Sequence, residues 1–302
     1  MILFIYKVIV NKPVRYQMYD NLDVVIADPA GNITIMVLTP VDRKDYAQVA
    51  QKLLKNKTLN GEQVAFMLPD SDRKQTTNHN DSLSDNDLSA GYPAMEMCGL
   101  EFCGNASRAF ALYRSSLSVP HKNEITVKVS GCDKPLTARI DHSTGNVEMD
   151  MPTPDEIREF TDKELSLNKG GTLVCLDGIA HLILQDVPPM KDTFEMLRDC
   201  IYENYDPDLP AFGVMFCDTV NQMMTPVVYV KDVDTTYFEG SCASGTVAAA
   251  YALATTLEDG THQLNLQQPG GTLCTTTIKK ENRIEKISLS GIITLSYVIH
   301  IS

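Results

Sequence analysis

The order of strand-like and helix-like segments occurs twice along the chain, and this internal repeat restricts the fold more than any other feature. In each half, two strands and a helix are followed by further strands and then by a helix that a cysteine opens. Aligning these cysteines, Cys103 and Cys242, places small residues at matching positions of both helices. The repeat predicts two similar α/β lobes that face each other across a cleft. Each lobe is expected to enclose one helix tightly and to point the N-terminus of that helix into the cleft.

A cysteine at the start of a helix has an unusual environment. Cys103 follows a strand-like run over residues 92–97 and precedes a helix-like run over residues 108–113. Unpaired backbone N–H groups and the positive end of the helix dipole meet at such a position, and both favour a thiolate. A single buried cysteine is otherwise a small apolar filler, and we assign that role to the remaining six: Cys98, Cys132, Cys175, Cys200, Cys217 and Cys274.

Two thiols at facing helix N-termini suit one kind of chemistry. The helix ends can hold the α-carboxylate of an amino acid, while a thiolate on one side takes the α-proton and a thiol on the other returns a proton. This is two-base racemisation, and it needs no prosthetic group. Desolvation raises the pKa of a thiol and the helix terminus lowers it, so the two effects together can leave the pKa values of the pair near neutrality.

The division between lobes falls at Pro152 and Pro154. We expect an N-terminal lobe over residues 1–150, completed by the last strand at about 290–302, and a C-terminal lobe over residues 151–289, with the active site between them. Residues 1–10 resemble a strand or an ordered extension more than a targeting segment. The polar segment 69–90 is interpreted as a surface loop without chemistry.

Composition excludes several classes of partner. The net charge of −13 and the isoelectric point near 4.9 argue against nucleic acid and anionic membranes. No apolar run approaches the roughly 20 residues of a membrane span. Eight cysteines without a secretion signal indicate a reduced, cytoplasmic protein. The absence of CxxC and HxxxH spacings argues against a metal site.

Two motifs resemble a known family. Phe102-Cys-Gly-Asn-Ala106 and Ser241-Cys-Ala-Ser-Gly-Thr246 are similar to the two catalytic motifs of the diaminopimelate epimerase family of cofactor-independent amino-acid racemases and epimerases. The resemblance extends from about residue 24 to residue 299. It implies two lobes, each a curved, mostly antiparallel sheet wrapped round a central helix, and it allows a homodimer. It also implies that Cys103 and Cys242 are the paired acid and base.

The resemblance extends to residues around the thiols. It implies that four residues at the helix starts contact the α-carboxylate: Gly104, Asn105, Ala243 and Ser244. Asn32 and Gln63 match substrate-contacting residues of the family. His181 and Glu239 resemble a His and a Glu that flank the thiols and assist proton transfer; the alternatives are a core histidine and a surface carboxylate.

Departures from the family pattern argue against diaminopimelate. Ile179-Ala180 stands where an Asn-Pro pair is usual, and the arginine that normally follows the motif glutamate is missing after Glu239. A further distal asparagine is replaced near Gly213. These groups hold the far end of diaminopimelate, and a buried ionic partner left unfilled would cost roughly several kcal/mol.

The details instead resemble the histidine racemase branch, which serves staphylopine-type metallophore synthesis. The matching segments are 29–35, 62–64, 101–106, 127–132 and 268–271. The short spacing from Glu239 to Cys242 matches as well. In this branch Glu62 is a candidate partner for the imidazole, the alternative being a solvated turn carboxylate. Two other hypotheses are diaminopimelate epimerase itself and a non-catalytic amino-acid-binding protein, which we would expect to lack one cysteine. Related phenazine-type isomerases lack the cysteine pair.

Overall fold

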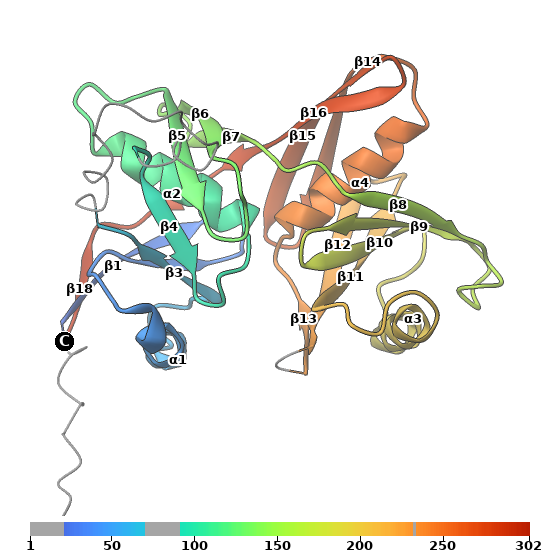
Figure 1. The fold of residues 1–302 in the computed structure, drawn as a ribbon, viewed down its shortest axis with the longest axis horizontal. Coiled ribbons are helices and arrows are strands. Elements are labelled where there is room, and N and C mark those ends of the chain that lie inside the picture. The colour runs from blue at the N-terminus through green and yellow to red at the C-terminus, as the bar shows by residue number, and fades with distance from the viewer. Residues whose placement is uncertain (1–20, 70–90, 232–233) are drawn as a thin grey trace, which may run out of the picture.

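The computed structural model describes residues 21–69, 91–231 and 234–302, and it has two lobes side by side (Figure 1). The expectations for residues 1–10 and for nearly all of 69–90 lie outside these residues. The first lobe contains β1 (Leu22–Asp28), β2 (Thr34–Val37), η1 (Arg43–Asp45), α1 (Tyr46–Lys55), β3 (Gln63–Met67), β4 (Ala94–Met97), α2 (Gly104–Ser116), β5 (Glu124–Val129), β6 (Leu136–Asp141) and β7 (Asn146–Asp150).

The second lobe repeats this plan with more strands. It contains β8 (Glu156–Phe160), β9 (Gly171–Leu176), β10 (Ile179–Gln185), α3 (Lys191–Asn204), β11 (Ala211–Asp218), β12 (Met223–Val230), β13 (Thr235–Phe238), α4 (Ala243–Thr255), β14 (Gly260–Gln268) and β15 (Gly271–Lys280). The last strands are β16 (Arg283–Ile292), β17 (Thr294–Leu295) and β18 (Ile299–Ile301).

The strands pair mostly antiparallel. Parallel neighbours are β2 with β3, β4 with β5 and β10 with β11, besides a single parallel bridge between β12 and β14. β16 lies between β15 of the second lobe and β7 of the first, and therefore joins the lobes (Figure 1). β17 and β18 return to the first lobe and pair with β1.

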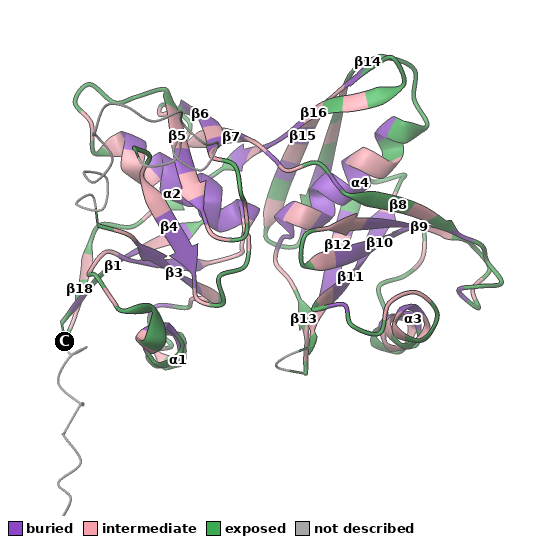
Figure 2. Ribbon diagram, viewed as in Figure 1, coloured by how far each residue is buried: buried purple, intermediate pink, exposed green. Residues whose placement is uncertain are grey.

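α2 and α4 lie within the strands of their own lobes, and Figure 2 shows purple over much of both helices, with green at the C-terminal end of α4. α2 buries all of its first nine residues, and α4 buries a run of small residues from Val247 to Ala250. Side chains this small let the strands approach the helix closely on every side. The predicted enclosure of both helices is confirmed.

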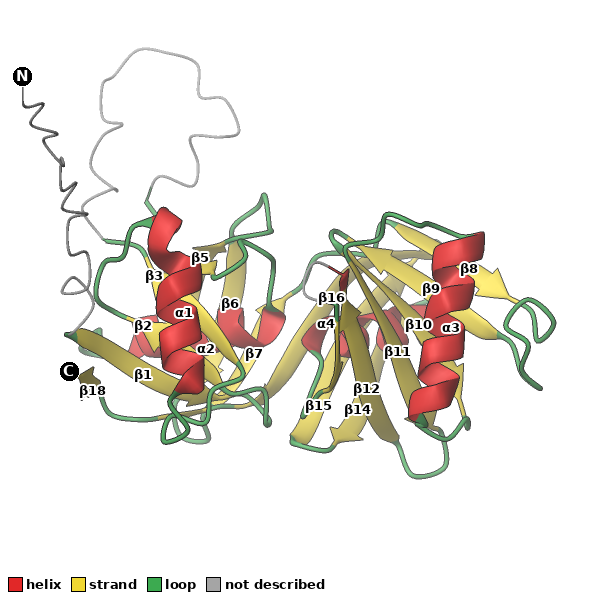
Figure 3. Cartoon of the chain, turned by 90° about the horizontal axis from the view of Figure 1, so that it is seen from below, coloured by secondary structure: helices red, strands yellow, loops and turns green. Residues whose placement is uncertain are grey.

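α1 and α3 cover the outside of the two lobes (Figure 3). On α3 the apolar side chains of Phe194, Leu197 and Ile201, spaced three and four residues apart, are fully buried. On α1 the buried face consists of Tyr46, Val49, Ala50 and Leu53, whereas Leu54 remains 41% exposed. The side chain of Asp42 before η1 bonds the ammonium of Lys44 and caps no helix.

Two strands were not predicted. β8 pairs only with β9 and carries mostly polar, exposed side chains, so it lacks the apolar alternation that identifies a strand. β13 pairs with β12 and exposes Tyr237 and Phe238. Glu239 follows β13 directly, so this strand sets the position of the acidic residue near the second thiol.

Candidate active site

Both cysteines cap their helices in the same way. The Sγ of Cys103 accepts the N–H of Ala106 at 3.4 Å, and the Sγ of Cys242 accepts the N–H of Gly245 at 3.4 Å. A hydroxyl four residues later, on Ser107 or Thr246, donates to the carbonyl of the capping cysteine. The thiols therefore take the place that a serine or aspartate oxygen occupies in ordinary N-caps.

The two helix starts face each other across the lobe boundary. A methyl group added at Gly104 would lie 3.0 Å from the Cβ of Ala243 and 2.6 Å from the Cε of Met151. The N–H groups of Gly104, Asn105, Ala243 and Ser244 occupy first-turn positions, where an intrahelical carbonyl cannot accept them. The arrangement is suited to an anion held between two helices.

The side chain of Asn105 links the two lobes. Its Nδ2 donates to the Oγ of Ser241 at 3.1 Å and to the Oδ1 of Asn32 at 3.4 Å. Its Oδ1 accepts the guanidinium of Arg108 at 2.8 Å. Because the amide is committed to protein partners, Asn105 offers an anion its backbone N–H and not its side chain.

Three predicted substrate-contacting residues lie together near Cys103. The Nε2 of Gln63 donates to the Oδ1 of Asn32 at 2.6 Å and to the hydroxyl of Thr34 at 2.8 Å. The Nδ2 of Asn32 donates to a carboxylate oxygen of Glu62 at 3.3 Å. The Gln63 amide also bonds the thiol of Cys103 and acts to lower its pKa. The turn after β1 and the start of β3 thus form one polar group beside the first thiol.

His181 reaches the second thiol through a serine. Its Nε2 lies 2.9 Å from the hydroxyl of Ser244, which lies 3.5 Å from the Sγ of Cys242. The imidazole is fully buried on β10, and burial lowers its pKa to about 3, so the ring is neutral at neutral pH. A methyl group at Gly213 would lie 2.5 Å from Nδ1, so glycine leaves room for the ring.

Glu239 is half-buried beside Cys242. Burial raises the pKa of this carboxyl to about 7; a hydrogen bond with Cys242 opposes the shift and the charge of Glu62 adds to it. The carboxyl therefore titrates in the physiological range, as a group that exchanges protons must.

The expectation of near-neutral thiols is wrong for this arrangement. Burial raises the pKa of Cys103, and the N–H of Ala106 and the amide of Gln63 offset it only in part. Burial raises the pKa of Cys242 well above its ordinary value, and the charge of Glu239 raises it further. At both thiols, desolvation raises the pKa by more than the helix terminus lowers it.

Sequence reasoning missed two residues as site residues. The Oε1 of Gln268 accepts the N–H of Cys242 at 2.9 Å, and its Nε2 donates to the hydroxyl of Thr246 at 2.8 Å. The 268–271 segment was noted as a motif without this role. Arg108 is fully buried beneath Asn105, and an arginine among the small residues of α2 was the signal that could have revealed it.

Backbone contacts bring the lobes together beside the thiols. The N–H of Gly270 donates to the carbonyl of Gly240 at 2.7 Å. A methyl group at Gly31, where φ is +84°, would lie 2.5 Å from the Cα of Gly270, and one at Gly240 would clash with the carbonyl oxygen of Gly31. Only glycine allows three backbone segments to approach this closely.

The chain is an isomerase of the racemase and epimerase type, as its similarity to histidine racemases shows. Among solved structures with this fold are a hydroxyproline epimerase from Agrobacterium vitis, with a TM-score of 0.57, 10% identity and coverage of 93% of this chain and 91% of that one, and a phenazine biosynthesis protein of the PhzF family from Enterococcus faecalis, with a TM-score of 0.55, 15% identity and coverage of 93% and 98%.

Sequence relatives identify the family. A histidine racemase from Fusobacterium nucleatum subsp. nucleatum is 32% identical over 241 residues, which cover 77% of this chain and 80% of that protein. A histidine racemase from Staphylococcus aureus is 24% identical over 273 residues, covering 88% and 92%. The family model for the histidine racemase CntK N-terminal domain matches residues 21–297, and the chain belongs to this family.

The part of the chain that the structure describes contains no group of three or more His, Cys, Asp or Glu side chains placed to hold a metal ion. Within residues 21–69, 91–231 and 234–302, no helix combines the length and the apolar character that crossing a membrane requires.

Proposed function

We propose that this protein interconverts L- and D-histidine by two-base proton transfer between Cys103 and Cys242, without a prosthetic group. The observation that carries the proposal is the pair of thiols capping two helix N-termini that face each other across the lobes. The named activity of the relatives supports histidine as the substrate.

The helix starts would bind the α-carboxylate. The N–H groups of Gly104, Asn105, Ala243 and Ser244 lie at both sides of the boundary between the helices. When the α-proton leaves, negative charge moves onto the carboxylate oxygens, so the same N–H groups and both helix dipoles stabilise the intermediate more than the substrate.

The proton balance needs only the two sulfurs. A thiolate on one face takes the α-proton, and the thiol on the other face gives its proton to the planar carbanion. At the end of the turnover the thiol and the thiolate have exchanged places. The enzyme then accepts the opposite enantiomer, or it returns to its first state by proton exchange with water.

Glu239 and His181 would support Cys242 in different ways. Glu239, whose pKa burial raises to about 7, can accept the thiol proton at neutral pH and return it. His181 is neutral and holds the hydroxyl of Ser244 near Cys242. The hydroxyl can then donate to the thiolate, as its effect of lowering the Cys242 pKa indicates.

The polar group of Asn32, Glu62 and Gln63 would receive the substrate beside Cys103. An imidazole N–H can donate to the carboxylate of Glu62, and imidazolium would bind it more strongly. Burial raises the pKa of Glu62, and its bond from Asn32 acts in the opposite direction. The missing arginine after Glu239 leaves the distal carboxylate of diaminopimelate without its family partner.

The proposal also covers the cellular compartment, the lobe boundary, the oligomeric state and the pathway. All eight cysteines are free thiols in the structure, which fits a reducing, cytoplasmic compartment. We place the lobe boundary at residues 150 and 151, with the final strands completing the first lobe. The family resemblance allows a homodimer and implies a supply of D-histidine to metallophore synthesis.

A side-by-side assay tests the substrate. Reduced enzyme is incubated without pyridoxal phosphate with L-histidine, LL-diaminopimelate and the other common L-amino acids, and the products are separated on a chiral column. We expect D-histidine as the main product. Failure to racemise histidine, or faster turnover of diaminopimelate, would refute the substrate assignment.

A further inference from the structure

The two ring nitrogens of His181 have different surroundings. His181 lies on β10, between β9 and β11, and its side chain is completely buried. Its Nε2 lies 2.9 Å from the hydroxyl of Ser244, whereas its Nδ1 has no hydrogen-bond partner among the residues described. In a neutral imidazole one nitrogen carries the proton and the other can only accept. The surroundings therefore decide which nitrogen is protonated.

The side of the ring that carries Nδ1 packs against β11. Gly213 pairs with His181 in the register of these parallel strands. A methyl group at Gly213 would lie 2.5 Å from Nδ1, 3.0 Å from Cε1 of the same ring and 3.0 Å from the Cε of Met215. Neither the Cα of Gly213 nor the methyl group of Met215 can accept a hydrogen bond from Nδ1.

This packing favours a proton on Nε2. In that tautomer the ring donates to the Oγ of Ser244 and leaves only a lone pair at Nδ1. The other tautomer would bury an N–H group without an acceptor, which is rarer in folded proteins than an acceptor without a donor. Burial also lowers the pKa of His181 to about 3, so the doubly protonated ring is excluded near neutral pH.

The tautomer sets the direction of the hydrogen bonds that reach Cys242. When Nε2 donates to the Oγ of Ser244, the hydroxyl proton needs another acceptor, and the Sγ of Cys242 lies 3.5 Å away. Cys242 also bonds the carboxyl of Glu239. A carboxylate only accepts, and the serine hydroxyl is left to donate. The sulfur can therefore lose its proton to Glu239 but not toward His181.

We propose that His181 is a positioning residue: its Nε2–H tautomer, selected by Gly213, turns the hydroxyl of Ser244 toward Cys242, where it donates to the thiolate. When Cys242 loses its proton, the carboxylate of Glu239 becomes a carboxylic acid and Ser244 stabilises the thiolate left behind. His181 keeps its single proton throughout. The inference rests on the proposed two-thiol function for its role in catalysis, whereas the tautomer and the bond to sulfur can be measured without substrate.

Nitrogen NMR of the resting enzyme tests the tautomer. Spectra of full-length protein with ¹⁵N-labelled histidine rings are recorded from about pH 6 to about pH 9. Replacing each of the six histidines except His181 in turn assigns the signals of that ring. We expect a protonated Nε2 and an unprotonated Nδ1 at every pH. A proton on Nδ1, or a second proton taken up in this range, overturns the proposal without a substitution at the site.

Alkylation tests the bond from Ser244 to the sulfur. Iodoacetamide reacts with the thiolate, so the labelling rate below the pKa of a thiol follows the thiolate fraction. In reduced Ser244→Ala the initial rate at Cys242 at about pH 9, followed by peptide mass spectrometry, should fall about tenfold, because the thiolate loses a charge-assisted hydrogen bond. The rate at Cys103 should stay the same.

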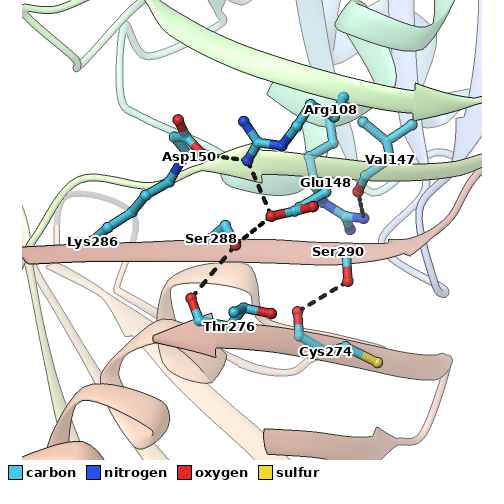
Figure 4. Close-up of polar contacts among 10 residues, drawn as sticks. Arg108, Val147, Glu148, Asp150, Cys274, Thr276, Lys286, Ser288 and Ser290 are labelled. Carbon is cyan, nitrogen blue, oxygen red and sulfur yellow. Dashed lines mark hydrogen bonds and ion pairs between the residues drawn. The ribbon is translucent and has the colours of Figure 1, made fainter. Parts of the chain in front are cut away.

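Ser288→Ala is the matched control for the loss of a hydroxyl. Ser288 is buried on β16, and its hydroxyl donates to a carboxylate oxygen of Glu148 at 2.7 Å (Figure 4). It bonds neither His181 nor a residue at the helix starts. We therefore expect Ser288→Ala to label Cys103 and Cys242 at the unmodified rates.

Replacing His181 tests whether the ring acts through Ser244. His181→Leu removes the donor and should slow the labelling of Cys242 in the otherwise unmodified protein. It should have no further effect in Ser244→Ala, where the hydroxyl is already missing. His181→Gln keeps an N–H donor and should restore most of the rate. Equal slowing by His181→Leu in both backgrounds would mean that the ring acts by packing alone, and would contradict the proposal.

Two other results would also contradict it. These are an unchanged rate at Cys242 in Ser244→Ala that retains the native circular dichroism, and an equal slowing at Cys103, as general loosening would cause. If His181→Leu does not fold, His181→Gln must label Cys242 near the unmodified rate, and the tautomer in the unmodified protein remains decisive. Because no substrate is present, these outcomes are independent of whether the enzyme racemises histidine.

Discussion

At the scale of single residues, Glu239 governs how readily Cys242 loses its proton in the proposed mechanism. Cys242 is buried and Cys103 is half-buried, and burial raises the pKa of each thiol, so neither ionises readily at neutral pH on its own. Glu239 alone among the groups bonded to Cys242 has its pKa raised to about 7. It can therefore take up the proton that Cys242 must release before acting as a base.

Removing this carboxyl should alter the pH dependence. In the unmodified enzyme Glu239 loses its proton as the pH rises through about 7, and the rate should rise with it. Glu239→Gln should remove this rise of the rate with pH and should lower kcat by about 10²-fold or more. The measurement is kcat for histidine racemisation from about pH 5.5 to about pH 8.5, with Glu203→Gln on the outer surface of α3 as the control. If kcat of Glu239→Gln still rises through about pH 7, the titration of another group causes the rise.

At the scale of elements, α2 and α4 each begin at a cysteine whose thiol serves as the helix cap. The cap bonds at Cys103 and Cys242 are equivalent in length and partner position. Serine is a good N-cap and should preserve the helix, whereas its hydroxyl ionises too weakly to act as a base near neutral pH. The structural and chemical roles of the cysteines can thus be separated.

Cys103→Ser and Cys242→Ser should each lower racemisation more than about 10³-fold while leaving the melting temperature nearly unchanged. Cys103→Ala should be equally inactive and also destabilised by about 1 kcal/mol, because the cap is lost. Racemisation rates and thermal unfolding are measured together, with Cys200→Ser on α3 as the control. A single serine variant with full activity would exclude the two-thiol mechanism.

The elements show what could be predicted from sequence. Local signals predicted α2 and α4, because a cysteine cap and the small residues after it are encoded within one segment. β8 and β13 escaped prediction, since their stability comes from pairing with distant strands and not from their own pattern.

The site follows the same rule. The motifs identified both cysteines, and the resemblance supplied residues around them that the fold gathers near each thiol. Arg108 and Gln268 were missed because their partners, such as Gly291 and Cys242, are far away in the sequence. The raised pKa of both thiols was also missed, since burial depends on the packing of the whole molecule.

At the scale of the whole molecule, the lobes meet through backbone as well as side chains. Gly31 comes from the first lobe, and Gly240 and Gly270 come from segments flanking α4. β16 forms the other connection, by pairing with both β7 and β15. The relative position of the two thiols therefore depends on contacts between glycines that have no reacting side chain.

Gly240→Ala should weaken catalysis without unfolding either lobe. The added methyl group would clash with the carbonyl oxygen of Gly31 and separate the segments by a few tenths of an ångström or more. Small misplacements of reacting groups are costly, and we expect kcat/KM to fall about 10-fold to 100-fold. Gly91→Ala is the control, because a methyl group there meets no atom within 4 Å. Unchanged kinetics in Gly240→Ala would show that this contact does not set the thiol geometry.

The fate of the α-proton tests the two-thiol account most directly. L-Histidine is incubated with the reduced enzyme in D₂O, and both enantiomers are separated and weighed by mass spectrometry before a tenth of the substrate has turned over. Two bases predict that D-histidine carries one deuterium at Cα while the remaining L-histidine keeps its hydrogen, since the donor thiol has exchanged with solvent. Deuterium appearing equally in unreacted L-histidine, or hydrogen retained in D-histidine, would point to a single base and contradict the account.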